Sequence, residues 1–247
     1  MAQSKIEWTE ATWNPSVGCD KISAGCKHCY AEVMAKRLQA MGAPGYENAF
    51  EFNIIPGRLD IPLKVKRPTK YFVNSMSDLF HERMPYDFLD RVFETIRKTP
   101  HHTYQILTKR ETNLQEYFAT RSVPENVWLG VSVENRAKKS RIDALRNIDA
   151  KIRFLSVEPL LENIGDLDLT NIHWVIVGGE SGRGARPMKP EWAINIQRQC
   201  ESQNVSFFFK QWGAWGADGQ KRNKKSNGRI LLGREWNENP LIASAVA

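Results

Sequence analysis

The chain has 247 residues, of which 41% are hydrophobic and 10% aromatic, so it can bury a substantial core and is not globally disordered. No apolar run approaches the ~20 residues that span a bilayer, and the first residues carry no apolar targeting segment. We therefore expect a cytoplasmic protein without a membrane contact. The formal net charge of +7 is modest for this length and is unevenly distributed along the chain.

The first segment, residues 6–15, carries Trp8 and Trp13 ahead of Pro15, which predicts a short extended stretch with both indoles in the core. It leads directly into Cys19, Cys26 and Cys29, spaced C-x6-C-x2-C. Thiols gathered this closely, in a chain without secretory features, indicate a metal site rather than disulfides. Three ligands leave a coordination position open, as in a four-iron cluster held by three cysteines.

Zinc is the alternative occupant of this loop. A closed zinc site would need a fourth ligand, from His28, His101 or His102.

Cys200 stands alone in a stretch of helical composition and is predicted to be a small buried residue. A role for Cys200 as a distant fourth ligand or hydrogen-atom donor is a lesser alternative.

Residues 31–41 have helical composition and end at Gly42, so strand, cysteine loop and helix form a first βα unit. Residues 42–70 hold four prolines and are predicted to be an irregular insertion. Beyond it, short apolar runs rich in β-branched and aromatic residues alternate with amphipathic stretches. The runs are 71–73, 104–107, 127–133, 152–157, 174–177 and 205–209; the helical stretches are 86–97, 136–146 and 191–203.

This alternation predicts an α/β fold of about six parallel βα units that curl into a TIM barrel or partial barrel. We expect a single domain over 1–247, with a C-terminal capping segment at about 212–247. Polar side chains follow every run, where barrel enzymes build their sites. The candidates from the six ends are Asn74, Ser75 and Asp78, then Lys109, then Ser132 and Asn135, then Glu158, Glu180 and Lys210.

Each candidate has a chemical role to offer and a structural alternative, namely an internal salt bridge. Ser132, Glu134 and Asn135 suit ribose hydroxyls. Lys109 and Arg110 suit a carboxylate or phosphate. Glu158 ends a very apolar run, so it needs either a basic neighbour or a substrate contact. Glu180 follows two glycines that allow close approach to a ligand amine.

The positive charge gathers near the C-terminus, where residues 183–247 contain eleven Lys or Arg and five Asp or Glu, a net +6. The basic run from Lys221 to Lys225 can contact phosphate, and Trp212 and Trp215 can stack on bases. A solvated loop explains the same charges. A nucleic acid is therefore a candidate partner.

Several stretches together carry a family resemblance. They are Trp13-Asn14-Pro15 with the cysteine loop, 72–80, 107–110, 130–135, 154–161, 174–182 and 207–213. In these the chain resembles an uncharacterised phage-associated family named for a three-cysteine motif. The end of its loop, Cys26-Lys27-His28-Cys29, resembles the cluster loop of radical S-adenosylmethionine enzymes, although the first spacing there is usually three. The chain is distantly similar to spore photoproduct lyases, and this resemblance implies a radical-S-adenosylmethionine-like partial TIM barrel.

The resemblance implies that Cys19, Cys26 and Cys29 bind a 4Fe-4S cluster and that S-adenosylmethionine is cleaved to a 5′-deoxyadenosyl radical. By position, Asn74, Ser75 and Asp78 would hold the methionyl amine, Ser132 and Asn135 the ribose, and Glu158, Glu180 and Lys210 would face the substrate. It also implies a three-Cys-motif partner protein and an external electron donor. The substrate is predicted to be a nucleic acid or nucleotide. The alternative is a zinc-stabilised, non-enzymatic protein that binds nucleic acid or a partner.

Overall fold

The computed structural model describes residue 4 and residues 6–240, in two compact units. The first unit comprises residues 1–132 and 141–151, and the second comprises 133–140 and 152–247. Residues 241–247, the end of the expected capping segment, lie outside the described part. None of the described helices has the length and apolar character that crossing a bilayer requires.

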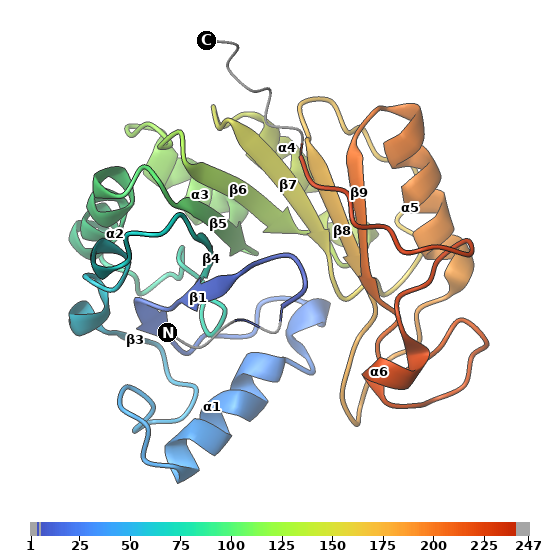
Figure 1. The fold of residues 1–247 in the computed structure, drawn as a ribbon, viewed down its shortest axis with the longest axis horizontal. Coiled ribbons are helices and arrows are strands. Elements are labelled where there is room, and N and C mark those ends of the chain that lie inside the picture. The colour runs from blue at the N-terminus through green and yellow to red at the C-terminus, as the bar shows by residue number, and fades with distance from the viewer. Residues whose placement is uncertain (1–3, 5, 241–247) are drawn as a thin grey trace. The chain divides into compact units, whose positions relative to one another are not determined.

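Four parallel strands form the centre of the first unit, in the order β1 (Ala11–Trp13), β4 (Lys70–Val73), β5 (Thr103–Thr108) and β6 (Val127–Ser132) (Figure 1). The register places Trp13 beside Val73, and Val73 beside Ile106. All six residues of β6 are buried, as a strand covered on both faces requires. Three helices follow these strands: α2 (Tyr86–Lys98), α3 (Glu111–Phe118) and α4 (Ser140–Arg146).

The remaining elements of the first unit surround the cysteine loop. Two short strands, β2 (Ser16–Val17) and β3 (Asn53–Ile54), pair antiparallel. Helix α1 (Tyr30–Ala40) follows the loop and lies at the foot of Figure 1. Three 3₁₀ turns complete the unit: η1 (Ala24–Cys26), η2 (Pro56–Arg58) and η3 (Pro62–Lys64).

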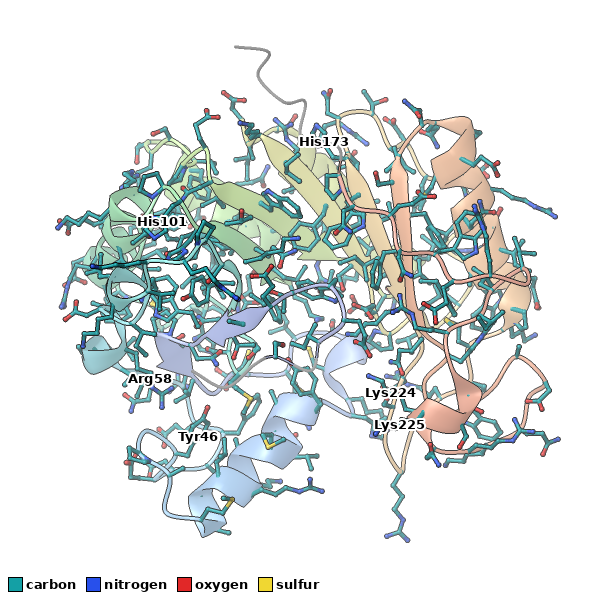
Figure 2. The ribbon with its side chains drawn as sticks, in the orientation of Figure 1. Tyr46, Arg58, His101, His173, Lys224 and Lys225 are labelled. Atoms are coloured by element: carbon teal, nitrogen blue, oxygen red, sulfur yellow. The ribbon has the colours of Figure 1, made fainter. Side chains whose placement is uncertain are left out.

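The irregular insertion predicted at 42–70 is fixed to the first strand by Arg58. Its guanidinium donates to the carbonyls of Asn14 and Pro44 and lies 5.8 Å from the Tyr46 ring centroid (Figure 2). The carbonyl of Arg58 in turn accepts the indole N–H of Trp13 at 2.8 Å. The insertion therefore holds the segment that leads into the cysteines.

The second unit contains three parallel strands in the order β7 (Ile152–Val157), β8 (Trp174–Gly178) and β9 (Ser206–Gln211). Helix α5 (Pro190–Ser202) packs against β8 and β9 (Figure 1). The short helix α6 (Lys224–Asn227) lies in the C-terminal segment, and the 3₁₀ turn η4 (Arg136–Lys138) follows Asn135. Cys200 is fully buried on α5, as predicted.

The predicted α/β class, a parallel sheet with helices in most of the connections between strands, is confirmed. The six predicted strands match β4 to β9 to within two residues at each end, and Trp8 and Trp13 are buried as expected. The stretch 136–146 divides into η4 and α4. Helix α3 was not predicted, because it is only eight residues long and buries just Leu114 and Tyr117, too few positions to show a helical hydrophobic period.

Candidate functional site

The cysteine loop begins at the carboxyl end of β4. Gly18 forms a parallel bridge with Ser77, its N–H donates to the Met76 carbonyl at 2.9 Å, and its carbonyl accepts the Ser77 hydroxyl at 2.7 Å. The N–H of Cys19 then donates to the Phe50 carbonyl at 3.1 Å. The first cysteine is therefore placed at the strand edge where the sequence predicts the site.

Gly18 is required by this geometry. Its φ is +74°, and a Cβ built there would lie 2.0 Å from the Glu51 carbonyl oxygen. Only glycine fits a left-handed position with backbone so close. The insertion and the start of the cysteine loop therefore touch backbone to backbone.

Asn74 and Ser75, predicted to hold a cofactor amine, have local partners. Asn74 adopts φ +57°, and its side-chain amide donates to the Ser16 hydroxyl at 2.8 Å while its oxygen accepts the Ser16 N–H at 3.4 Å. The Ser75 hydroxyl donates to Asn14 Oδ1 at 3.2 Å, and its carbonyl accepts the Tyr30 hydroxyl at 2.5 Å. Both residues tie the Asn-Pro segment and the start of α1 to the end of β4.

Asp78 is buried and accepts four hydrogen bonds. Its Oδ1 accepts the Thr108 hydroxyl at 2.7 Å and the Phe80 N–H at 3.0 Å. Its Oδ2 accepts the Lys109 N–H at 3.0 Å and a guanidinium N–H of Arg110 at 3.2 Å. The carboxylate is thus satisfied within the protein and joins the ends of β4 and β5.

Arg110 is the cation that contacts a sulfur of the cysteine loop. Its Nη1 lies 3.3 Å from Cys19 Sγ, and its Nη2 donates to the Asp20 carbonyl at 3.2 Å. The side chain is only 3% exposed and is held by Asp78 and by Glu82, whose Oε2 accepts from Nε at 2.8 Å. A buried guanidinium between two carboxylates is a fixed donor, and here one of its N–H groups points at sulfur.

The cysteines differ in their tendency to ionise. Burial raises the pKa of Cys19 to about 11, against the opposing charge of Arg110. Burial also raises the pKa of Cys26, but the Lys109 charge and hydrogen bonds from Ile22 and Ser23 outweigh it and hold the pKa below its ordinary value. The Ser23 hydroxyl lies 3.5 Å from Cys26 Sγ. All three loop cysteines are free thiols and partly exposed.

Lys109 and Ser132, two predicted cofactor-binding residues, lie together. The Lys109 ammonium donates to the Ser132 hydroxyl at 3.1 Å. The charge of the same ammonium helps to lower the pKa of Cys26. Lys109 therefore lies close to both the end of β6 and the cysteine loop. Ser132 also offers its carbonyl to the buried Arg141 at 2.9 Å, which the sequence alone did not indicate.

Two of the three histidines considered as a fourth zinc ligand are on the wrong edge. His102 precedes β5, at its amino end, and its ring nitrogens bond the Thr69 N–H at 3.2 Å and the Pro62 carbonyl at 3.2 Å. The His101 Nε2 lies 3.0 Å from the Val65 carbonyl. The cysteine loop meets the carboxyl ends of the strands, so the proposal of His101 or His102 as a ligand is wrong.

Asp20, His81 and Glu82 bring three potential metal-ligand atoms within 4.8 Å of one another. However, His81 Nδ1 accepts the Arg83 N–H at 3.1 Å, which assigns the proton of the neutral ring to Nε2. That nitrogen lies 3.1 Å from Asp20 Oδ2 without good hydrogen-bond geometry. The buried ring therefore presents an N–H rather than a lone pair, which does not suit a metal.

In the second unit, two predicted catalytic residues form a pair. Glu158 Oε1 lies 3.2 Å from the Lys210 ammonium, and its Oε2 accepts the Ser156 hydroxyl at 3.1 Å. Gly178 makes room for this carboxylate, because a Cβ there would lie 2.5 Å from Oε1. Of the two alternatives expected for Glu158, a basic neighbour or a substrate contact, the structure shows the basic neighbour.

Glu180 is also paired, with an arginine that sequence reasoning missed. Arg186 donates to Glu180 Oε2 from its backbone N–H and its Nε, both at 2.8 Å, and to Oε1 from Nη2 at 2.5 Å. The only sequence signal for this pair was an arginine six residues downstream in a glycine-rich loop.

Asn135, by contrast, has a buried Oδ1 without a hydrogen-bond partner among the described residues. It is the predicted residue that most needs a ligand.

The C-terminal segment corrects one prediction. Trp212 is only 3% exposed and donates its indole N–H to the Ile230 carbonyl, so it cannot stack on a base. Trp215 is partly exposed, with the Lys221 ammonium 5.5 Å from its ring centroid. Arg222 forms an ion pair with Asp218 at 2.5 Å, so its charge is already compensated.

Comparisons with known proteins give a fold likeness and a family. No curated protein matches the chain. Among solved structures, the chain resembles spore photoproduct lyase complexed with dinucleoside spore photoproduct, with 13% identity, a TM-score of 0.44, 80% of this chain covered and 62% of that chain. A mutant of spore photoproduct lyase gives 12% identity and a TM-score of 0.49, with coverage of 85% and 78%. The chain thus spans less than two thirds of the first of these proteins. A family model described as "Protein of unknown function (DUF5131)" matches residues 3–240, and the chain belongs to that family.

Proposed function

We propose that the protein is a radical S-adenosylmethionine enzyme that holds a 4Fe-4S cluster on Cys19, Cys26 and Cys29. The observation that carries the proposal is a loop of three free thiols at the carboxyl ends of parallel strands, beside the cations Arg110 and Lys109. The donor set fits the group, because thiolates are the ligands of iron–sulfur clusters and nearby cations stabilise thiolates. When bound, such a cluster supplies the electron that cleaves the cofactor.

The side chains of the first unit divide into two roles in this proposal. Lys109 and Ser132 bind the cofactor, by its carboxylate and its ribose, since they present an ammonium and a hydroxyl at the strand ends. Asn74 and Asp78 act through other residues, because their polar atoms are already engaged by Ser16 and Arg110. Their task is to hold the loop and the arginine in place.

In the second unit we assign Asn135 to a ligand hydroxyl and the Glu158–Lys210 pair to the substrate. Asn135 offers a buried oxygen that no described residue satisfies. Glu158 and Lys210 are respectively 14% and 20% exposed, which leaves both side chains within reach of a ligand. A carboxylate and an ammonium at hydrogen-bond distance can exchange a proton during a reaction. Glu180 is a positioning residue, because Arg186 occupies both of its oxygens.

A nucleic acid or nucleotide is the proposed substrate class. The support is the net +6 of residues 183–247 and the exposed side chains of Lys221 and Lys225. Lys224 and Lys225 are neighbours on α6 (Figure 2). A phosphate backbone is the common ligand for clustered lysines.

The test is anaerobic reconstitution of the wild-type protein with iron and sulfide, followed by iron analysis and assay of S-adenosylmethionine cleavage. We expect about four irons per chain and cleavage on reduction, as the three-cysteine cluster of this enzyme class requires. Substitution of any one of Cys19, Cys26 or Cys29 by serine should abolish both results. The matched control is Cys200→Ala, a buried thiol in the other unit, which should retain both. A colourless protein with one zinc would support the zinc-stabilised binder instead.

A further inference from the structure

Helix α1 exposes a row of large apolar side chains. Tyr30, Val33, Met34 and Met41 are 59%, 53%, 41% and 77% exposed. At the helical repeat these positions fall on one face. We call these four residues the α1 stripe. Large apolar side chains gathered on one exposed face are typical of an interaction site, whereas singly scattered ones are not.

The apolar packing of α1 uses the other side of the helix, and within the stripe the Tyr30 hydroxyl donates to the Ser75 carbonyl. The core-facing side of α1 is formed by Ala31 and Ala35, which pack in a cluster with Val17, Tyr46 and Met76. Two of the four stripe residues are methionines, whose flexible side chains adapt to partner surfaces.

The stripe begins at the cysteine loop. Cys29 is the residue that precedes the first turn of α1, so Tyr30 directly follows a proposed cluster ligand. Within the loop, Ile22 is a further exposed apolar residue. A protein bound to the stripe would therefore lie against the loop that holds the cluster.

The surroundings of the stripe are positively charged. Residues 21–41 contain four Lys or Arg and one Asp or Glu, a net +3. The single acid, Glu32, is shared by Lys21 at 2.7 Å and Lys36 at 3.0 Å. Lys27 and Arg37 are exposed, and Arg37 lies on the same face of α1 as the stripe. This charge favours an acidic partner and repels a second copy of the same surface.

We propose that the α1 stripe is the docking surface for an acidic, one-electron carrier protein that reduces the cluster. This inference rests on the proposed function, which needs one electron for each cleavage event. The exchange transfers a single electron: the carrier is oxidised by one electron and the cluster is reduced by one, and no atom moves. Apolar contact gives the complex its affinity, and the basic rim directs the acidic carrier to the loop.

The experiment compares two reductants on the reconstituted protein, dithionite and a reduced acidic flavodoxin. The variant is Val33→Glu combined with Met41→Glu, which places charge on the stripe without touching the cysteines. The matched control is Leu63→Glu, an apolar residue that is 44% exposed elsewhere in the first unit. Flavodoxin binding is measured separately by calorimetry on each protein, with and without the cluster.

We expect the double variant to retain wild-type cleavage with dithionite and to lose about tenfold in flavodoxin affinity and flavodoxin-driven cleavage, while Leu63→Glu retains both. Higher salt should weaken binding to the wild type. Equal flavodoxin affinity in the wild type and the double variant would overturn the docking proposal. So would absence of saturable binding to the wild type, or a wild-type dimer that the variant dissociates. Failure of dithionite to drive cleavage in the wild type would instead overturn the proposed function.

Discussion

Arg110 is the residue on which the geometry of the candidate site depends most. Its buried guanidinium contacts Asp78, Glu82 and Cys19 at once. The sequence predicted a cation at this strand end, because Lys109 and Arg110 follow an apolar run. It did not predict which of the two would face inward to sulfur, since that depends on the Asp78 carboxylate of the neighbouring strand.

Replacing Arg110 with methionine should lower the free energy of unfolding of the metal-free protein by about 3 kcal/mol, because Asp78 would keep a buried charge without its partner. Arg110→Lys should lower the free energy of unfolding by less, because lysine retains the positive charge but not the several N–H donors of the planar guanidinium. Urea denaturation measures both. The control is Arg121→Met, whose partner Asp90 is 47% exposed, and its loss should be much smaller. Equal losses for the two methionine variants would show that the Arg110 pair carries no special weight.

The same Arg110 variants should shift the reduction potential of the reconstituted cluster. A hydrogen bond from a cation to a ligand sulfur stabilises the reduced, more negative state. Arg110→Met should therefore lower the midpoint potential in a spectroscopic redox titration, and Arg110→Lys should lower it by less. An unchanged potential in Arg110→Met would mean that the contact with Cys19 Sγ does not persist in the loaded protein.

At the scale of elements, Gly18 joins β2, the insertion and the cysteine loop. An alanine at Gly18 would have an unfavourable positive φ, and its Cβ would clash with the Glu51 carbonyl oxygen. An alanine at Gly42 would also have a positive φ, of +66°, but its Cβ would have no neighbour within 4 Å. Gly42→Ala should cost about 1–2 kcal/mol from strain alone. Gly18→Ala should cost more and should reduce the iron content after reconstitution. Denaturation and iron analysis compare them, and equal stability of the two variants would contradict the close backbone approach.

A second element-scale prediction concerns pH. Burial lowers the pKa of His102, which packs among the rings of His101, Tyr71 and Tyr104. Because the folded pKa lies below the unfolded value near 6.5, the unfolded chain binds protons more readily, so stability is lost as pH falls below about 6.5. In His102→Gln the free energy of unfolding should fall less between pH 7 and pH 5. An identical pH slope in both proteins would show that His102 does not contribute.

The elements themselves were largely predictable, and the reason is local. Strands such as β6 and β8 are continuous apolar runs bounded by polar residues, a pattern that needs no tertiary information. Helix α3 was missed because it is short. The pairing of Glu158 with Lys210 joins the residue after β7 to strand β9, so it depends on tertiary structure, whereas Glu180 pairs with Arg186 within one loop. The sequence indicated that Glu158 needs a basic neighbour or a substrate contact, but it did not identify Lys210 as that neighbour. It did not single out Arg186 as the partner of Glu180.

At the scale of the whole molecule, the charge distribution should govern binding to nucleic acid. A single-stranded DNA oligonucleotide should bind with an affinity that falls as salt rises, with a slope of about 0.7 for each phosphate contact. Neutralising Lys221, Lys224 and Lys225 to glutamine should reduce that slope by about 2, as measured by fluorescence anisotropy. Lys98→Gln, which removes a lysine paired with Glu94 in the first unit, should leave it unchanged. An unaltered slope in the triple variant would exclude this segment as the binding surface.

The proposed radical chemistry requires iron bonded to the sulfurs of the three loop cysteines. The most direct measurement is anomalous diffraction at the iron absorption edge from crystals of protein reconstituted and kept without oxygen. We predict one four-iron cluster bonded to the Sγ atoms of Cys19, Cys26 and Cys29, at the carboxyl ends of β4 and β5. Iron bound elsewhere, or a single zinc ion held by these thiols, would contradict it.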